Sequence, residues 1–259
     1  MPGHSPATSL PYHNARKLVV DDHRAYRLLM EALLAQLGLA HQACADGQQA
    51  LELLASEPFD LVITDCRMPV MDGYAMTRQL RQREQAAGRA TIPVLAYTAT
   101  LGPDEIRHCM ACGMNGWLTK PVGLAQLDEV LRDWLVPAAP HMPRPRTCGR
   151  RPGLPSRASL IEAFGSWDVV EPMLFQLLQE AHEDLAVLAH ACACLDASLT
   201  AQRLHRLVGS VAFLGTTGLE PRAVQLIARV NQLGVARNAW ALEQFQQDVE
   251  TYLQCLADL

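Results

Sequence analysis

The chain has 259 residues, of which 49% are apolar and 19% charged, a composition typical of one large or two modest globular domains. A net charge of −5 gives no support to direct nucleic-acid binding, and no apolar run is long enough to cross a bilayer. Because the start lacks a signal-peptide pattern and the eight cysteines form no disulfide framework, we expect a cytoplasmic protein without membrane contact.

The first half of the chain alternates between two kinds of pattern. Residues 1–15 are polar and contain three prolines, and we interpret them as a flexible leader. Five βα units over residues 16–135 then predict an α/β doubly wound domain with a five-stranded parallel sheet. Strands are expected over 17–20, 39–43, 61–64, 92–97 and 116–119, and helices over 24–37, 48–54, 74–84, 103–112 and 124–134.

The second half contains no strand pattern. Residues 136–157 hold six prolines and five arginines and lack apolar periodicity, which indicates a linker; its basic run is also compatible with contact to an acidic surface. Over residues 158–259, apolar residues recur at helical spacing and predict an all-α four-helix bundle. The helical segments are 160–164, 170–188, 197–214, 219–233 and 239–256.

Polar side chains stand where the predicted strands end. Asp21 and Asp22 follow the first strand, and Asp65 follows the third. An aspartate in such a position can cap the next helix, but the carboxyl edge of an open parallel sheet is also where ligands bind. The fourth strand leads into Thr98 and the fifth into Lys120, so we expect all five side chains to converge on one crevice.

The chemistry of this set suits phosphoryl transfer. Three neighbouring carboxylates require a cation, and ligands that are all oxygen favour Mg²⁺. Asp65 would attack, while Lys120 and Thr98 hold the transferring oxygens. Lys120 is one of two lysines against 20 arginines, which fits a need for a compact ammonium. Three helix-capping acids and an unrelated lysine are the alternative.

Four motifs occur in a familiar order: LVVDD, VITDCRMPVMDG, VLAYTAT and GWLTKPV. With them, residues 16–135 closely resemble the receiver domain of two-component signalling proteins, which has a flavodoxin-like fold. The resemblance implies that Asp65 is the phosphoacceptor. It also implies that Asp22 and Asp65 bind Mg²⁺ directly with the backbone carbonyl of Arg67, and that Asp21 acts mainly through water.

The same resemblance assigns roles at the other strand ends. Thr98 and Lys120 would contact the phosphoryl group. Trp117 would take the place of the switch aromatic residue, where tyrosine or phenylalanine is commoner, and would act with Thr98. The Lys120–Pro121 bond would be cis.

A second pattern lies in AQRLHRLVGSVAFLG, residues 201–215. The apolar residues form one stripe of a helix, and His205 points about 140° from its centre. We therefore expect His205 to be exposed, with Ala201, Gly209 and Ala212 as small neighbours. A glycine inside a helix costs about 1 kcal/mol, so Gly209 suggests close approach by a partner or close helix packing. From these residues alone His205 is either a surface residue or a nucleophile.

The stretch HRLVGS resembles the phosphoacceptor signature of histidine-containing phosphotransfer (HPt) domains, four-helix modules that follow receivers in many phosphorelay proteins. The resemblance covers residues 158–259 and implies that His205 is phosphorylated. Val208 stands where the family usually has lysine. The implied docking face consists of Ala201, Gln202, Val208, Gly209 and Ala212.

The receiver–HPt order resembles the C-terminal part of virulence-sensor-type hybrid histidine kinases, although the chain contains no ATP-binding kinase core. We therefore expect a bacterial phosphorelay protein. A sensor histidine kinase would phosphorylate Asp65, and His205 would pass the phosphoryl group to a downstream response-regulator receiver. The alternatives are a receiver switch with a degenerate bundle that only docks partners, and a phosphate sink.

Overall fold

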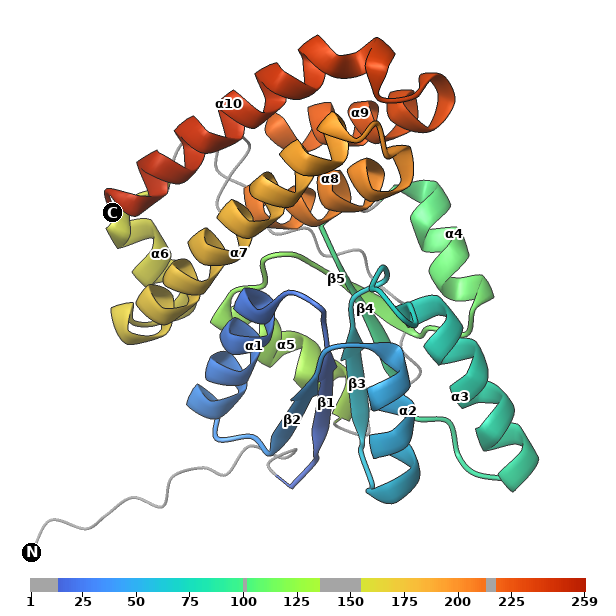
Figure 1. Ribbon diagram of the computed structural model, residues 1–259. Helices are drawn as coiled ribbons and strands as arrows, with labels where there is room; N and C mark the ends of the chain where they lie inside the picture. The colour runs from blue at the N-terminus through green and yellow to red at the C-terminus, as the bar shows by residue number, and fades with distance from the viewer. Residues whose placement is uncertain (1–13, 100–101, 136–154, 213–217) are drawn as a thin grey trace, which may run out of the picture.

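The computed structural model describes residues 14–99, 102–135, 155–212 and 218–259. A parallel five-stranded sheet with helices on both faces comes first, and a group of helices packs above the carboxyl ends of its strands (Figure 1). Most of the predicted leader, 1–15, and of the predicted linker, 136–157, lies outside the described residues. No helix within the described ranges is long and apolar enough to cross a membrane.

The predicted parallel sheet is confirmed, with strand order β2-β1-β3-β4-β5. The central strands are short and wholly buried, as expected for β-branched runs covered on both faces. The strands are β1 (Lys17–Val20), β2 (His41–Cys44), β3 (Leu61–Thr64), β4 (Val94–Thr98) and β5 (Gly116–Thr119). The helices between them are α1 (Arg24–Gln36), α2 (Gly47–Ser56), α3 (Gly73–Ala87), α4 (Pro103–Ala111) and α5 (Leu124–Leu135).

Alternate residues of each strand supply two apolar cores. Val19 and Ile63 pack in one cluster with α1 and α5, whereas Leu18 and Val62 pack in a second cluster with α2, α3 and α4. The sheet is therefore covered on both faces, and its carboxyl edge is left for the side chains that follow the strands.

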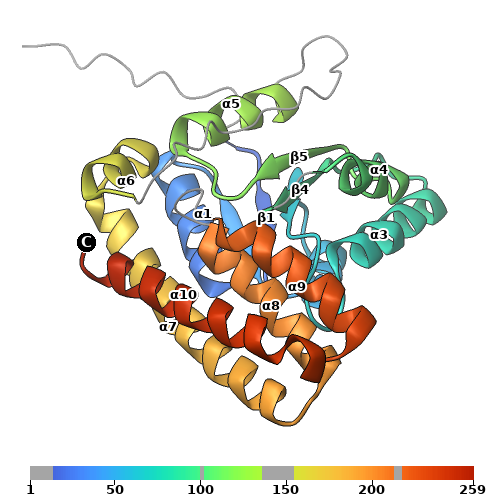
Figure 2. The same cartoon turned by 90° about the horizontal axis from the view of Figure 1, so that it is seen from above.

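The second part of the chain is helical throughout the residues described. Its elements are α6 (Arg157–Phe164), α7 (Trp167–Ala193), α8 (Ala197–Ala212), α9 (Leu219–Leu233), the short 3₁₀ helix η1 (Ala236–Asn238) and α10 (Ala239–Ala257). Helix α8 packs on α7 and α9, and α10 packs on the same two helices. Seen from above, α7, α8, α9 and α10 run alongside one another (Figure 2). We refer to α6–α10 as the helical region.

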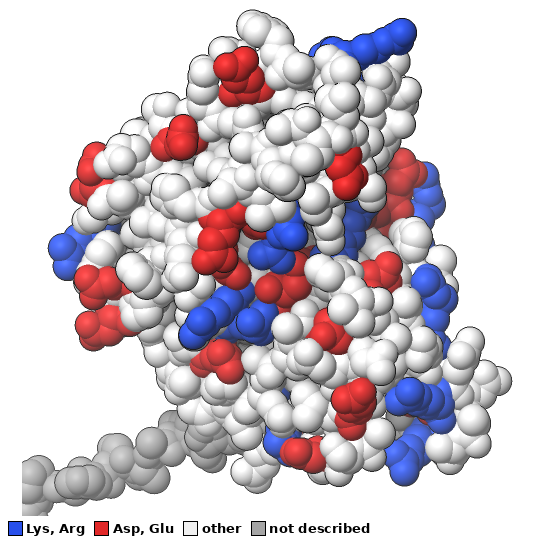
Figure 3. All heavy atoms as spheres, viewed as in Figure 1, with Lys and Arg blue, Asp and Glu red and all other residues white. Residues whose placement is uncertain are grey.

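The helical region and the sheet share one core. Helix α1 packs against α7, and a single apolar cluster joins Leu29 and Leu33 of α1 to Leu174 and Leu177 of α7. On the face seen in Figure 3, side chains of both charges lie along the boundary between the two parts. The residues above the carboxyl edge therefore face the helical region.

Candidate functional site

Three carboxylates meet at the carboxyl edge of the sheet. Val20 pairs with Thr64 across β1 and β3, so the residues that follow these strands stand side by side. Asp21, Asp22 and Asp65 each offer an oxygen, and these oxygens lie within 4.8 Å of one another. Burial raises the pKa of Asp21 to about 6; the charge of Lys120 opposes this shift, and the charges of Asp65 and Asp22 add to it. The structure thus brings together the three acids that the sequence singled out.

Lys120 is the cation that pairs with Asp21 and Asp65 of this cluster. Its Nζ lies 2.6 Å from Asp21 Oδ2 and 2.9 Å from Asp65 Oδ2, and its side chain is almost wholly buried. Burial acts to lower the pKa of Lys120, but the charges of Asp21 and Asp65 outweigh it and raise the pKa well above its usual value. The ammonium therefore stays charged beside Asp65. The Lys120–Pro121 bond is cis.

Thr98 and Trp117 differ in their relation to this cluster. Thr98 is the last residue of β4, is buried, and lines the same pocket as Asp65 and Lys120. Trp117 lies in β5 and packs partly buried against the apolar cluster of α2, α3 and α4, and it is absent from the residues that line the pocket. Its indole Nε1 is buried without a hydrogen-bond partner in the described structure. Trp117 therefore packs in the apolar core of that face and does not line the pocket.

The donor set fits a small, hard cation. All the available ligands are carboxylate oxygens, the type that Mg²⁺ prefers. Metal–oxygen bonds of about 2.1 Å place opposite ligand oxygens roughly 4.2 Å apart. Because the three oxygens here spread over as much as 4.8 Å, a water bridge to one acid or a small shift would complete the coordination. This is the one group of at least three possible metal ligands within the described residues.

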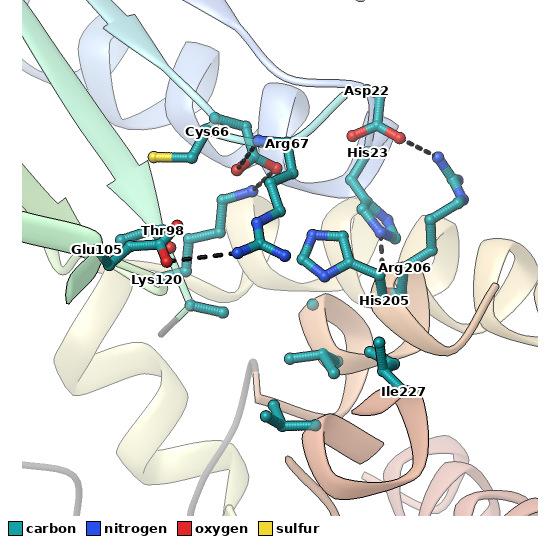
Figure 4. A pocket seen from close by; sticks show the side chains of 15 residues that line it. Asp22, His23, Cys66, Arg67, Thr98, Glu105, Lys120, His205, Arg206 and Ile227 are labelled. Atoms are coloured by element: carbon teal, nitrogen blue, oxygen red, sulfur yellow. Dashed lines mark hydrogen bonds and ion pairs between the residues drawn. The ribbon is translucent and has the colours of Figure 1, made fainter. Parts of the chain in front are cut away.

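His205 lies on α8 and lines the pocket together with Asp65, Thr98 and Lys120 (Figure 4). The expectation that His205 is exposed is wrong, because the receiver-like half covers that face of α8 and leaves the side chain only partly accessible. Burial, partly opposed by the charge of Asp65, lowers the pKa of His205. The neutral imidazole, which has a free lone pair, is therefore favoured.

The other residues expected on the face around His205 have different environments. Gln202 is exposed and Ala201 partly exposed, whereas the side chain of Ala212 lies outside the described residues. Val208 is only 2% exposed and belongs to the apolar core, although it also borders the pocket. Val208 is thus mainly a core residue.

Gly209 lies against the first half of the chain. A Cβ atom there would stand 3.3 Å from His23 Nε2 and 3.5 Å from the ring of Tyr26. The close approach that the glycine suggested is therefore made by this chain's own α1 and the residue before it.

Several residues that hold the two halves together did not stand out in the sequence. Tyr26 donates its hydroxyl to the carbonyl of Gly209, at 2.6 Å, and His23 Nε2 is 3.0 Å from the carbonyl of Arg206. On α7, Glu180 accepts hydrogen bonds from the backbone of α1, and Asp184 pairs with Arg206. Their one sequence signal is that Glu180 and Asp184 fall at the helical spacing of the apolar stripe of α7, where buried acids require cationic or N–H partners.

The sheet and its acidic edge lie within the part of the chain that matches a known family. Residues 18–132 match the model of the response regulator receiver domain, and this part of the chain belongs to that family. The chain is 33% identical over 221 residues to the sensor histidine kinase GacS of Pseudomonas protegens, covering 83% of this chain and 24% of GacS. It is 30% identical over 227 residues to the virulence sensor protein BvgS of Bordetella bronchiseptica, covering 84% of this chain and 18% of BvgS.

Solved structures of receiver proteins are also similar. The receiver domain of the sensor histidine kinase PA1611 of Pseudomonas aeruginosa, with magnesium in its active-site cleft, is 34% identical; the match covers 47% of this chain and 98% of that one, with a TM-score of 0.43. The chemotaxis regulator CheY4 of Vibrio cholerae is 31% identical, covering 47% and 99%, with a TM-score of 0.44. The chain spans about a quarter or less of the length of GacS and BvgS.

Proposed function

We propose that the chain is a two-component phosphorelay protein in which Asp65 and His205 exchange a phosphoryl group within one molecule. A sensor histidine kinase supplies the group to Asp65, and a downstream receiver takes it from His205. The observation that carries the proposal is that both residues line one pocket, with Thr98 and Lys120 beside them.

The transfer step follows from the groups that face this pocket. The lone pair of the neutral His205 ring nitrogen forms a bond to phosphorus while the bond from phosphorus to the Asp65 oxygen breaks. The electron pair of that bond returns to the carboxylate, and the second ring nitrogen keeps its proton. Lys120 and the Thr98 hydroxyl hold the phosphoryl oxygens. Asp22, Asp65 and the Arg67 carbonyl, with Asp21 through water, would hold Mg²⁺, which would neutralise charge on the phosphoryl oxygens.

Two further observations support an HPt function for the helical region. The alignments to GacS and BvgS cover 83% and 84% of the chain, which is more than the 154 residues before Pro155, so they extend into the helical region. His205, in the stretch HRLVGS, also lies on the side of α8 that faces the acidic edge, as this function requires. On this proposal, residues 16–135 are the receiver and residues 158–259 the HPt domain.

Radiolabelled phosphate from a small phosphodonor tests the proposal. With Mg²⁺, the wild-type chain is expected to carry base-labile label on Asp65 and acid-labile label on His205. Asp65→Asn should lose both, whereas His205→Gln should keep the first and lose the second. His190→Gln is the matched control, because His190 is an exposed histidine on α7, and it should behave as wild type.

A mixture of the two variants tests whether transfer stays within one chain. If Asp65→Asn is mixed with His205→Gln, label reaches the intact His205 only by transfer between molecules. We expect little label there compared with wild type at equal concentration. Absence of acid-labile label from the wild type itself would favour a docking module, and rapid release of phosphate without such label would favour a phosphate sink.

A further inference from the structure

Arg206, the residue after the proposed phosphoacceptor histidine, connects the helical region to the acidic edge. Its Nη1 pairs with Asp22 Oδ2 of the receiver (Figure 4), and its Nε lies 3.0 Å from Asp184 Oδ2 on α7. The guanidinium is mostly buried, with 17% of the side chain exposed. Arginine remains protonated at all ordinary pH values, so this is a permanent charge.

The charges at this edge are divided between two cations. Lys120 Nζ lies 2.6 Å from Asp21 and 2.9 Å from Asp65, and Arg206 forms the ion pair with Asp22. Arg206 also pairs with Asp184 at 3.0 Å and with Glu180 at 3.9 Å, so its guanidinium is shared between acids of the receiver and of α7. Asp22 is also one of the three acids whose oxygens form the candidate cation site. The carboxylate that would ligate Mg²⁺ is therefore the one that holds the helical region through Arg206.

We propose that Arg206 and Mg²⁺ compete electrostatically at Asp22, so that docking of the helical region weakens Mg²⁺ binding. Mg²⁺ bound at Asp22 would stand close to the guanidinium that pairs with the same carboxylate, and like charges repel strongly in a mostly buried site. Linkage makes the effect reciprocal: bound Mg²⁺ loosens the contact between α8 and the receiver by the same factor.

This inference rests on the proposed function for its consequence in the relay. With Mg²⁺ on an unphosphorylated receiver, the contact is weakened and the acidic edge opens to the kinase. A phosphoryl group on Asp65 adds about one negative charge, by analogy with other phosphorylated side chains. Arg206 then regains a favourable site, and His205 returns to face Asp65 when there is a group to accept. Binding of Mg²⁺ would thus favour transfer from the kinase to Asp65, and phosphorylation of Asp65 would then favour transfer from Asp65 to His205.

Calorimetric titration of Mg²⁺ into the full chain tests the competition without any phosphorylation. Arg206→Gln removes the charge, and we expect it to bind Mg²⁺ about tenfold more tightly than wild type, a typical size for such coupling. Arg206→Lys keeps the charge and should stay close to wild type. Arg203→Gln is the matched control: Arg203 lies on the same helix and pairs with Asp184 at 2.8 Å, and within the described residues it forms no ion pair with the receiver.

Small-angle scattering of the same proteins gives the reciprocal effect. Mg²⁺ should increase the radius of gyration of wild type and of Arg203→Gln, and beryllofluoride added with Mg²⁺ should reverse the increase. Equal Mg²⁺ affinity for wild type and Arg206→Gln would overturn the inference and leave the proposed relay standing. So would equally tight binding by Arg206→Lys and Arg206→Gln, because charge would then not be the cause. Failure of Mg²⁺ to bind any variant would overturn both this inference and the metal part of the proposed function.

Discussion

Replacement of Glu180 by alanine should uncap a helix in the other half of the molecule. Helix α1 begins after His23, whose side chain makes no capping hydrogen bond. Instead the two carboxylate oxygens of Glu180, on α7, accept hydrogen bonds from the backbone N–H groups of Arg24 and Ala25, each at 3.0 Å. These are N–H groups that the first turn of a helix leaves unpaired. Glu180 is 9% exposed, so water cannot fully replace it.

Three estimates give the size of the effect. Loss of an N-cap costs about 0.5–2 kcal/mol, and loss of a hydrogen bond to a charged group about 1.5–3 kcal/mol. Burial acts to raise the pKa of Glu180, but the hydrogen bond and charge of His23 and the two backbone N–H groups outweigh it and lower the pKa from 4.5 to about 2. That difference corresponds to roughly 3 kcal/mol. Because these figures describe the same contacts, we expect Glu180→Ala to lower the free energy of unfolding by about 2–3 kcal/mol in total.

The lowered pKa also fixes the direction of the pH dependence. A carboxyl group whose pKa is lower in the folded state stabilises that state above its unfolded pKa of 4.5. The contribution is then lost progressively as the pH falls from 4.5 to about 2. The wild-type advantage over Glu180→Ala should accordingly be larger above pH 4.5 and shrink across this window.

Urea unfolding followed by circular dichroism measures the free energy, and hydrogen exchange measures protection of the Arg24 and Ala25 amides. Both should fall in Glu180→Ala. Glu183→Ala is the matched control, since Glu183 lies exposed on the same helix and accepts one hydrogen bond, from Gln179 at 3.3 Å. The reasoning fails if the two variants are equally stable, or if exchange at Arg24 and Ala25 is unchanged in Glu180→Ala.

Two substitutions on α8 test the packing around the proposed phosphoacceptor. Gly209→Val should separate the two halves, because a Cβ at this position would stand 3.3 Å from His23 Nε2 and the two further methyl groups would have no room. The separation would be measured as a larger radius of gyration with the helical content retained. A Gly209→Val variant with an unchanged radius of gyration would contradict this prediction. Val208→Lys should lower the free energy of unfolding by at least about 2 kcal/mol, since the substitution removes a buried apolar side chain and buries an ammonium. A Val208→Lys variant that gains phosphohistidine without losing stability would contradict this prediction.

The sheet and its acidic edge could be predicted from the sequence because both depend on local patterns. Buried β-branched runs give strands, and the residue after each strand must stand at the carboxyl edge. The ends of two strands differ from the prediction. The second strand, expected over 39–43, occupies His41–Cys44, and the fourth, expected over 92–97, begins at Val94, after Pro93, which has no N–H for the sheet.

The contact between the two halves could not be predicted in the same way. Helical periodicity separates the polar from the apolar face of α8, but it does not say whether another part of the chain covers the polar face. The periodicity therefore predicts an exposed His205, although the receiver covers much of this side chain. Arg206 likewise has no feature in the sequence that indicates its partners, Asp22 and Asp184. Long-range pairs of this kind leave no trace in local spacing.

Two of the contacts between α8 and the receiver are to the backbone of α8, and this bears on how His205 can be tested. His23 Nε2 lies 3.0 Å from the carbonyl of Arg206, and the Tyr26 hydroxyl donates to the carbonyl of Gly209 at 2.6 Å. Backbone carbonyls one and four residues after His205 remain whatever side chain stands at 205, so they fix the register of α8 against α1. A substitution of His205 should therefore remove the imidazole without moving the helix. Loss of label in His205→Gln can then be attributed to the missing nucleophile.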